Sequence, residues 1–360
     1  VAVPDGMEVL EDSALPVAWF DVTLTSDTNA DVAVAFSWED IIGRELRDPA
    51  SLDGLDGQVF EGDRIHRLDA MNDLGHGGWP LMPRVPTAAQ PYRGNGTKGI
   101  VQSAAAPLRP RKATFQGYVS QVAVVAQTTD NEHVTLLPAY DISTAAAIAN
   151  ASSAEQSPDP WKSFRETGAF PDTIAPTIAS PVPLSGPDSP PRASAVAVKT
   201  TVRAGKPKTF RFMVVWYFPE LIVDRATAPK GSFFGDCDYG RYFHNFFNSV
   251  DSLVAYAARE RDRIRRETRE WQTPILNSSL PEWLQFKILN SAYTLYTNTI
   301  LNKAGDFTVL EGGMAGLAGT MDQRISAHPA YQKFFTQLDR SEMQLFADTR
   351  DRDEHYILHF

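Results

Sequence analysis

The chain has 360 residues, of which 43% are hydrophobic and 22% charged, so it has the composition of a globular protein and the length for two domains with a large core. A net charge of −10 argues against nucleic acid as a partner, and no apolar run approaches the roughly 20 residues of a transmembrane segment. The single cysteine, Cys237, excludes an intrachain disulfide. No signal peptide is evident. We expect a soluble protein, and secretion or a bacterial periplasmic location is left open.

Residues 1 to about 220 carry the pattern of β-strands. β-branched and aromatic residues are frequent, and at 31–40 two valines and a phenylalanine alternate with alanines, which is typical of strands. The clearest runs lie at residues 15–26, 31–40, 112–127, 133–140, 193–204 and 208–219. The pattern predicts an antiparallel β-sandwich, and we place this N-terminal domain at residues 1–245.

Two segments interrupt the strand pattern. Residues 66–96 are rich in glycine and proline, and residues 151–192 are rich in proline. We expect long loops in both, with one short helix at 158–168 that Trp161 and Phe164 pin to the sheet. Long loops on a rigid scaffold are often functional, and irregular surface is the alternative.

The hydrophobic period changes to 3.6 residues at Ser249, which predicts helices from there onward. The first helix covers 249–272, with an apolar first half and a run of mixed charges at 259–270. We interpret this run as a solvated helix face with i,i+4 ion pairs. Such a helix suits a linker between two domains, which we place at residues 246–275.

Two further helices are predicted. The second covers 281–301 and is apolar around most of its circumference, so we expect it to be buried on more than one side. The third covers 330–349 and is amphipathic. Its predicted inner side carries Phe334, Phe335, Leu338, Leu345 and Phe346.

A glycine-rich stretch at 307–329 carries the candidate chemistry. A β-like run ends at Glu311, and a second acid, Asp322, follows eleven residues later. Glycine lets the backbone approach a ligand closely, but the spacing of nucleotide-binding loops is absent. Two carboxylates suit glycoside cleavage, which needs one acid near the anomeric carbon and another near the leaving oxygen. An ordinary turn at Glu311 is the alternative interpretation.

Several stretches also carry a likeness to a known family of enzymes. They are "DSALPVAWFDVTLTSDTNADVAVAFSWED" and "FRFMVVWYFPE" in the β half, followed by "YGRYFHNFF", "SLPEW" and "FTVLEGG". In content and order these stretches resemble the glycoside hydrolase family of the non-lysosomal glucosylceramidases and the bacterial β-glucosidases and β-xylosidases. The resemblance implies a retaining glycosidase for β-linked glucosides or related sugars (xylosides, galactosides, glycosylceramide-like substrates), without a cofactor or metal.

The resemblance implies roles for individual residues. In that family the glutamate of a Leu-Glu-Gly motif is the nucleophile and the aspartate of a Thr-x-Asp motif binds the sugar, which assigns these roles to Glu311 and to Asp322, with Thr320 beside it. We expect Gly312 to contact substrate as well, and Arg324 either to hold Asp322 or to face a sugar hydroxyl. The family has aromatic residues and an asparagine between the two motifs, whereas this chain has Gly-Met-Ala-Gly-Leu-Ala-Gly, so we expect different substrate contacts.

The resemblance further implies an (α/α)6 barrel as the catalytic domain. Residues 276–360 offer only its first helices, and the acid/base aspartate of the family has no counterpart in the chain. The opening strands of the family's sandwich are missing too. We therefore expect an internal piece of a longer enzyme, with a carbohydrate substrate and with the rest of the barrel supplied by the same gene or by a partner chain.

Two other functions remain open on the sequence. A non-catalytic carbohydrate-binding sandwich would suit loops that carry Trp38, Trp79 and Trp161, and an inverting glycosidase or phosphorylase would suit a sandwich followed by a barrel. The role of Glu311 separates the first of these from an enzyme. His244 fits a hydrogen-bonded structural residue better than a catalytic one, and the histidines lack the spacing of a zinc site.

Overall fold

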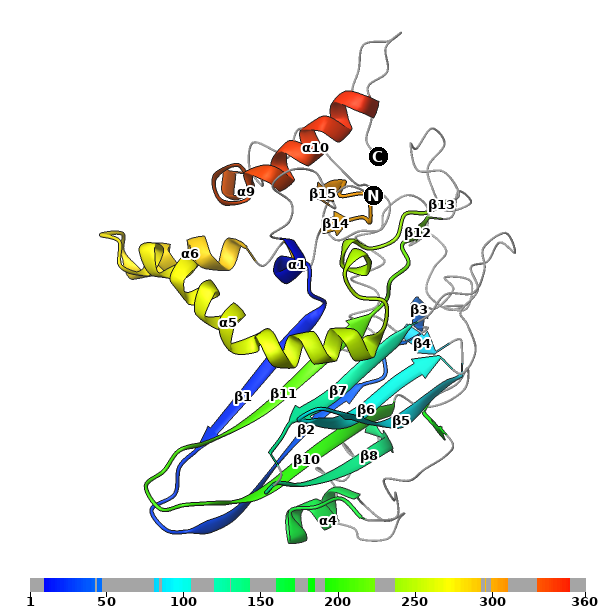
Figure 1. The fold of residues 1–360 in the computed structure, drawn as a ribbon, viewed down its shortest axis with the longest axis vertical. Coiled ribbons are helices and arrows are strands. Elements are labelled where there is room, and N and C mark those ends of the chain that lie inside the picture. Colours follow the sequence, from blue (N-terminus) through cyan, green and yellow to red (C-terminus); the bar gives the residue numbers. More distant parts are fainter. Residues whose placement is uncertain are drawn as a thin grey trace, which may run out of the picture.

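The computed structural model describes residues 10–42, 44–46, 81–83, 86–104, 120–129, 131–142, 160–171, 181–184, 192–223, 237–292, 295, 299–309 and 329–349. Antiparallel sheets dominate these residues, with helices on their outer faces and toward the C-terminus (Figure 1). The predicted antiparallel β architecture is confirmed. The division into domains stays a prediction.

The larger sheet has six strands in the order β1-β11-β7-β6-β5-β9. They are β1 (Val17–Leu24), β5 (Thr87–Gly94), β6 (Thr97–Ala104), β7 (Gln121–Gln127), β9 (Val182–Pro183) and β11 (Lys208–Tyr217). The smaller sheet has the order β2-β10-β8, with β2 (Ala30–Glu39), β8 (His133–Asp141) and β10 (Arg192–Val202). Every pairing in both sheets is antiparallel.

The core lies between the two sheets, and strand periodicity decides which side chains reach it. In β7, Val122, Val124 and Ala126 point into this core, where Val196 and Val198 of β10 meet them. The intervening residues of β7 are equally buried, because they face a helix on the other side of the sheet. Successive side chains alternate between the faces of a strand, so a strand buried on both faces reads as a continuous apolar run.

Each sheet has a helix on its outer face. The first half of α5 (Val250–Leu276) packs Leu253, Val254 and Ala257 against the six-stranded sheet, and it follows the 3-10 helix η3 (Tyr242–Asn245). On the three-stranded sheet, α4 (Pro160–Thr167) packs Trp161 and Phe164. The predicted short helix pinned by these two aromatics is therefore confirmed.

Helix α5 begins with a capping box, since the Ser249 hydroxyl accepts a hydrogen bond from the Ser252 amide and the Ser252 hydroxyl accepts one from Ser249. The helix predicted at 249–272 is observed and runs four residues further. Its charged run is not simply solvated. Arg261 is only 4% exposed and forms an ion pair with Asp21 of β1. The predicted i,i+4 ion pairs are observed at Arg263–Glu267 and Arg266–Glu270, and residues 265–270 are exposed. Arg261 is the exception, because the helix lies against Asp21 of the first strand.

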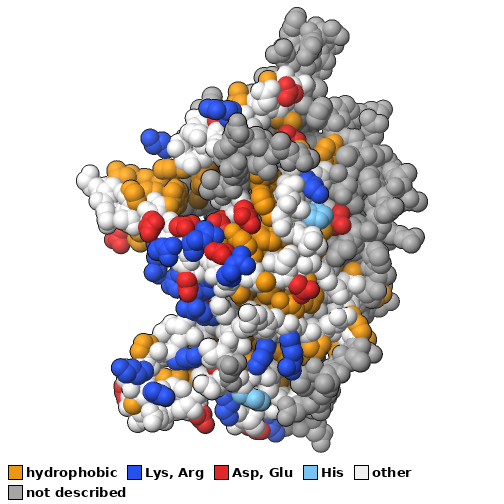
Figure 2. All heavy atoms as spheres, viewed as in Figure 1, with side chains coloured by type: hydrophobic (Ala, Val, Ile, Leu, Met, Phe, Trp, Pro, Cys, Tyr) orange, Lys and Arg blue, Asp and Glu red, His pale blue; other side chains and the backbone are white. Residues whose placement is uncertain are grey.

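A second charged contact joins α5 to α1 (Leu10–Ser13). Arg263 donates two hydrogen bonds to Asp12, at 2.8 and 3.0 Å, and the Tyr256 hydroxyl donates a third at 2.9 Å. The bonds from Arg263 lower the pKa of Asp12, while burial and the bond to Asp12 raise the pKa of Tyr256 to about 12. Figure 2 shows the resulting mixture of basic and acidic side chains over α5.

The remaining elements are short. Three two-stranded sheets pair β3 (Arg44–Leu46) with β4 (Leu81–Pro83), β12 (Ile222–Val223) with β13 (Cys237–Asp238), and β14 (Thr299–Leu301) with β15 (Phe307–Val309). Three helices lie toward the C-terminus: α6 (Glu282–Ser291), α9 (Pro329–Phe334) and α10 (Thr336–Thr349). In Figure 1, α10 lies beside the β14–β15 hairpin.

The loop predicted at 66–96 is wrong where the structure describes it. Strands β4 and β5 lie there, and β5 forms a hairpin with β6 through Asn95-Gly96. Gly96 has a φ of 67°, the left-handed conformation that such two-residue turns require. Pro91 misled the prediction. It is tolerated because β9 pairs only with Ala88 and Ala89, so the rest of β5 behaves as an edge strand.

The predictions for the second and third helices are wrong in part. Helix α6 ends at Ser291 instead of 301, and Thr299–Leu301 is strand β14, in line with its β-branched residues. No residue of α6 is buried, so the described part of the chain does not provide the burial expected from the apolar circumference of this helix. The third helix is broken at Phe335 into α9 and α10, and Phe334, predicted to face inward, is 37% exposed.

Candidate active site

The residues with predicted roles fall in one segment, 310–328. Glu311, Gly312, Thr320, Asp322 and Arg324 all lie there, outside the described residues. The structure describes what holds this segment on both sides, namely the β14–β15 hairpin before it and helices α9 and α10 after it. These flanking elements fix the position of Val309, the last described residue before Glu311.

The turn of the hairpin is locked by its own side chains. The amide group of Asn302 donates a hydrogen bond of 2.8 Å to the carboxylate of Asp306, and the Asp306 backbone N–H returns one of 2.9 Å to the Asn302 side chain. The Asn302 backbone N–H bonds the Asp306 carbonyl at 3.0 Å. Asn302 is 5% exposed, so these bonds satisfy polar groups that water does not reach.

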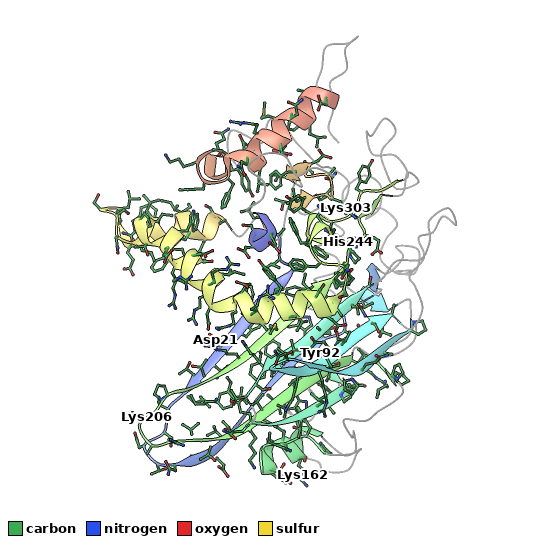
Figure 3. The ribbon with its side chains drawn as sticks, in the orientation of Figure 1. Asp21, Tyr92, Lys162, Lys206, His244 and Lys303 are labelled. Carbon is green, nitrogen blue, oxygen red and sulfur yellow. The ribbon has the colours of Figure 1, made fainter. Side chains whose placement is uncertain are left out.

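The same turn is attached to the chain that leaves the sandwich. The Lys303 N–H bonds the carbonyls of Tyr239 and Gly240 at 3.2 and 3.1 Å, and the Asn245 side chain donates to the Lys303 carbonyl at 2.9 Å. Gly240 has a φ of 61°, and an added Cβ would lie 2.9 Å from the Lys303 Cβ. Figure 3 labels Lys303 and His244 in this junction. The sandwich thus holds the turn end of the hairpin.

Helix α10 holds the other strand of the hairpin. The Ser341 hydroxyl accepts from the Phe307 N–H at 3.1 Å and donates to the Gly305 carbonyl at 3.0 Å. One carboxylate oxygen of Glu342 accepts from the Val309 N–H at 2.8 Å and from the Thr308 hydroxyl at 3.2 Å. Both Thr308 and Glu342 are almost completely buried, at 2% and 1% exposed. The strand therefore enters the 310–328 segment from a fixed position.

Aromatic packing brings the two ends of the segment together. The ring of Phe307, just before the segment, lies 5.9 Å from the ring of Tyr331, just after it, in an edge-to-face arrangement. Both residues are fully buried, and Tyr331 also contacts Phe335. The described residues just before and just after the segment with Glu311 and Asp322 therefore lie together.

The β14–β15 hairpin, α9 and α10 form a frame for the segment, and a shifted pKa is found beside it. Burial lowers the pKa of Arg241, which forms a β-bridge with Asn302 at the turn end of the hairpin. His244 lies in η3 with its ring 6.3 Å from that of Tyr217. In the described part of the chain no group of three or more His, Cys, Asp or Glu side chains could hold a metal ion.

The prediction missed Glu342 and Ser341, although a signal for Glu342 exists. Leu338, Glu342 and Phe346 are spaced by four residues, so they share one helix face, and all three are buried. An acid in the middle of an apolar helical stripe indicates a polar partner inside the protein. The Asn302–Asp306 turn was missed because the second helix was predicted to run through residue 301.

Two of the three tryptophans offered as a sugar platform are occupied in packing. Trp38 lies between the sheets against Phe36 and Trp216, at ring distances of 6.4 and 5.7 Å. Trp161 meets Tyr140 and Phe170 edge to face. Trp79 lies outside the described residues. A binding surface built on these three side chains is therefore not supported by Trp38 and Trp161.

Comparison with known proteins assigns the chain to a class of enzymes. A family model described as beta-glucosidase 2, glycosyl-hydrolase family 116 N-term, matches residues 8–264, which include both sheets and the first half of α5. The chain therefore belongs to glycosyl-hydrolase family 116, in agreement with the resemblance seen in its sequence. A search of the curated proteins finds no match. Among the described helices, none combines the length and apolar character needed to cross a membrane.

Proposed function

We propose that the protein is a retaining glycosidase for β-linked glucosides or related sugars, with Glu311 as its nucleophile. Xylosides, galactosides and glycosylceramide-like compounds are the related substrates. The observation that carries the proposal is membership of glycosyl-hydrolase family 116 over residues 8–264. The matched residues end before Glu311, so its role rests on the Leu-Glu-Gly motif at 310–312 and on the frame around it.

The frame supports a nucleophile at this position. A nucleophilic carboxylate must be held close to the anomeric carbon and oriented by fixed groups. Strand β15 is hydrogen-bonded to β14 on one edge and to α10 on the other, and it ends two residues before Glu311. Loops on rigid elements often carry catalytic residues, because the scaffold fixes both ends.

The reaction follows the two-step scheme of retaining glycosidases. A carboxylate oxygen of Glu311 bonds to the anomeric carbon while the glycosidic C–O bond breaks, and the leaving oxygen takes a proton from a second acid. Water then attacks the same carbon, gives a proton to that second group, and releases Glu311 and the free sugar. We place the proton donor outside residues 1–360. Asp322, with Thr320 and Arg324 beside it, holds sugar hydroxyls, and Gly312 lets the ring approach the backbone.

We further propose that residues 276–360 begin an (α/α)6 barrel, that 246–275 link it to the sandwich at 1–245, and that the rest of the barrel comes from the same gene or a partner chain. The apolar surface of α6 supports this arrangement. Trp283 is 66% exposed and Phe286 49%, and Figure 2 shows hydrophobic side chains gathered over this helix. An apolar patch of this kind is typical of an interface.

The test uses the complete enzyme and an aryl β-glucoside with a good leaving group. Replacing Glu311 with alanine removes the nucleophile, so turnover should fall by about 10⁴-fold or more while the protein stays folded. Azide should restore part of the activity and yield a glycosyl azide of inverted configuration, because it enters from the side that the carboxylate vacated. Glu166→Ala, which removes an exposed carboxylate from α4 on the sandwich, is the matched control and should leave turnover unchanged.

Other outcomes favour the alternatives. Near-normal turnover in Glu311→Ala would remove the proposal and leave a different catalytic group to be found. Absence of hydrolysis in the unmodified complete protein, together with sugar binding, would favour a non-catalytic carbohydrate-binding protein. A product of inverted configuration from the unmodified enzyme would indicate an inverting glycosidase or phosphorylase, for which the two carboxyls should lie about 6.5–9.5 Å apart instead of about 5–5.5 Å.

A further inference from the structure

The outer edge of β15 is closed by a helix instead of a strand. Among the described strands, β15 pairs only with β14, so the N–H groups of Phe307 and Val309, which are two residues apart, share the outer edge. Ser341 and Glu342, adjacent residues of α10, accept hydrogen bonds from these two N–H groups at 3.1 and 2.8 Å. Two neighbouring side chains of one helix thus replace the missing strand.

The two contacts differ in chemistry and in place. Ser341 offers a neutral hydroxyl near the turn, and its other bond goes to Gly305 in that turn. Glu342 offers a carboxylate oxygen at the far end of the strand, where it receives both the Val309 N–H and the Thr308 hydroxyl. The Glu342 oxygen accepts two hydrogen bonds from β15, whereas the Ser341 hydroxyl accepts one. The firmer contact is therefore at the end of the strand from which the chain proceeds to Glu311.

The burial of Glu342 indicates why an acid occupies this position of α10. Glu342 is 1% exposed, and an acid is rarely buried so completely unless it is hydrogen-bonded, because the charged form loses its hydration. Leu338 and Phe346 on the same stripe of α10 show that an apolar residue satisfies the packing there. An apolar side chain at position 342 would leave the Val309 N–H without an acceptor. Glu342 therefore provides a hydrogen-bond acceptor for a backbone N–H of β15.

We propose that Glu342 is a positioning residue that fixes the backbone leading to Glu311, an inference that rests on the proposed role of Glu311. Val309 is only two residues before Glu311 in the chain, so a displacement of the Val309 backbone is passed on to Glu311 through two peptide links. A catalytic group must be held to within about 0.5 Å, and a misplacement of 1 Å costs on the order of 100-fold in rate. Glu342 acts through β15, whose Val309 N–H it holds at 2.8 Å.

The test compares three variants of the complete enzyme with the unmodified protein. Glu342→Ala removes the acceptor of Val309, so kcat should fall on the order of 100-fold with little change in KM. Glu342→Gln keeps a carbonyl oxygen at the same place, so it should recover most of that loss. Ser341→Ala removes the neighbouring contact at the turn end and is the matched control, with kcat expected within about threefold of the unmodified enzyme.

Hydrogen exchange of peptides that cover 299–309 supplies a readout independent of catalysis. Exchange of the Val309 amide should accelerate in Glu342→Ala and stay near the unmodified rate in Glu342→Gln. If Glu342→Ala does not fold, Thr308→Val takes its place. This variant removes one of the two bonds to Glu342, and kcat should fall by about three- to tenfold at constant KM.

Several results would overturn the inference. Unchanged kcat and unchanged exchange in Glu342→Ala would do so, and so would unchanged kcat in Thr308→Val where that variant replaces it. An equal loss of kcat in Ser341→Ala would also do so, because Glu342 would then have only a general packing role. Failure of the proposed function looks different. In that case Glu311→Ala keeps its turnover while exchange at Val309 still responds to Glu342→Ala.

Discussion

The sandwich and the C-terminal helices differ in how completely they bury their apolar side chains. The five central residues of β7, 122–126, are 0% exposed, whereas α6 has no buried residue and exposes Trp283 and Phe286. In the C-terminal part, burial is concentrated where α9 and α10 meet the hairpin, at Phe307, Tyr331 and Phe346. The sandwich is held by its own core, whereas the C-terminal part is organised around the one strand that leads to Glu311.

The largest expected effect comes from the sandwich core. Phe212 is 1% exposed and stacks on Phe36 at 5.4 Å, so Phe212→Ala should lower the free energy of unfolding by about 3–5 kcal/mol. Phe334→Ala, at a residue 37% exposed, is the matched control and should cost less than about 1 kcal/mol. Urea unfolding followed by circular dichroism measures both. Equal losses would remove the contrast between the two regions.

A smaller effect is expected where α5 crosses from one region toward the other. Arg261→Ala removes a buried guanidinium that pairs with Asp21, and Arg265 still holds Asp21 at 2.9 Å. The unfolding free energy should therefore fall by about 1–3 kcal/mol. Arg266→Ala, in the same helix but with an exposed partner, Glu270, at 3.9 Å, should change it by less than about 0.5 kcal/mol. A loss in Arg266→Ala as large as in Arg261→Ala would contradict the assignment of Arg261 as a structural contact.

The contact between α5 and α1 should make stability depend on pH in two windows. The pKa of Asp12 lies below its ordinary 3.8 in the folded protein, so its contribution is present above about pH 4 and is lost as the pH falls through the folded pKa. The pKa of Tyr256 is raised from 10.0 to about 12, so its contribution is complete below pH 10 and is lost as the pH rises toward 12.

Both groups are partly exposed, so each contribution should be about 1 kcal/mol or less. Asp12→Asn should flatten the acid limb of the stability profile, and Tyr256→Phe should flatten the alkaline limb. Urea midpoints measured from pH 3 to pH 12 test this. An Asp12→Asn variant with the acid limb of the unmodified protein would show that other carboxylates determine it.

The smallest effect on stability is expected at α6. Replacing Trp283 and Phe286 with serine removes exposed side chains, so the unfolding free energy of residues 1–360 should change by less than about 0.5 kcal/mol. Self-association should fall, because the apolar patch is smaller. Sedimentation velocity measures this. Strong destabilisation by the double substitution would mean that these side chains already support the fold.

The sequence-based predictions of secondary structure succeeded where burial alone decides the conformation. Alternating valines in β2 and β10 predict strands because burial between two sheets decides their conformation. The sequence-based predictions failed where a contact with a distant part of the chain overrides the local pattern. Pro91 is accommodated by a nearly unpaired strand edge, and Arg261 is drawn into the interior by an acid 240 residues away in the chain. Neither partner can be identified from the residues nearby.

The same holds for the candidate site. The sequence marked Glu311 and Asp322, and the structure describes the contacts that hold the chain on either side of them. Glu342 escaped prediction because hydrophobic periodicity identifies the inner face of a helix by its apolar residues, and a buried acid weakens that pattern. The Asn302–Asp306 turn escaped because apolar residues at 292–301 are compatible with either a helix or a strand.

The order of strands in the two sheets has a consequence for synthesis. In the described sheets β1 pairs only with β11, and β2 only with β10, so both N-terminal strands must wait for residues 192–217. At about 5–20 residues per second, the ribosome needs roughly 10–40 s to make the chain from the end of β2 to the end of β11. During this interval the apolar face of β2, with Val32, Val34 and Phe36, has no partner strand. A nascent chain of this design exposes the apolar faces of its first strands until β10 and β11 emerge, and α5, which covers the six-stranded sheet, is made later still.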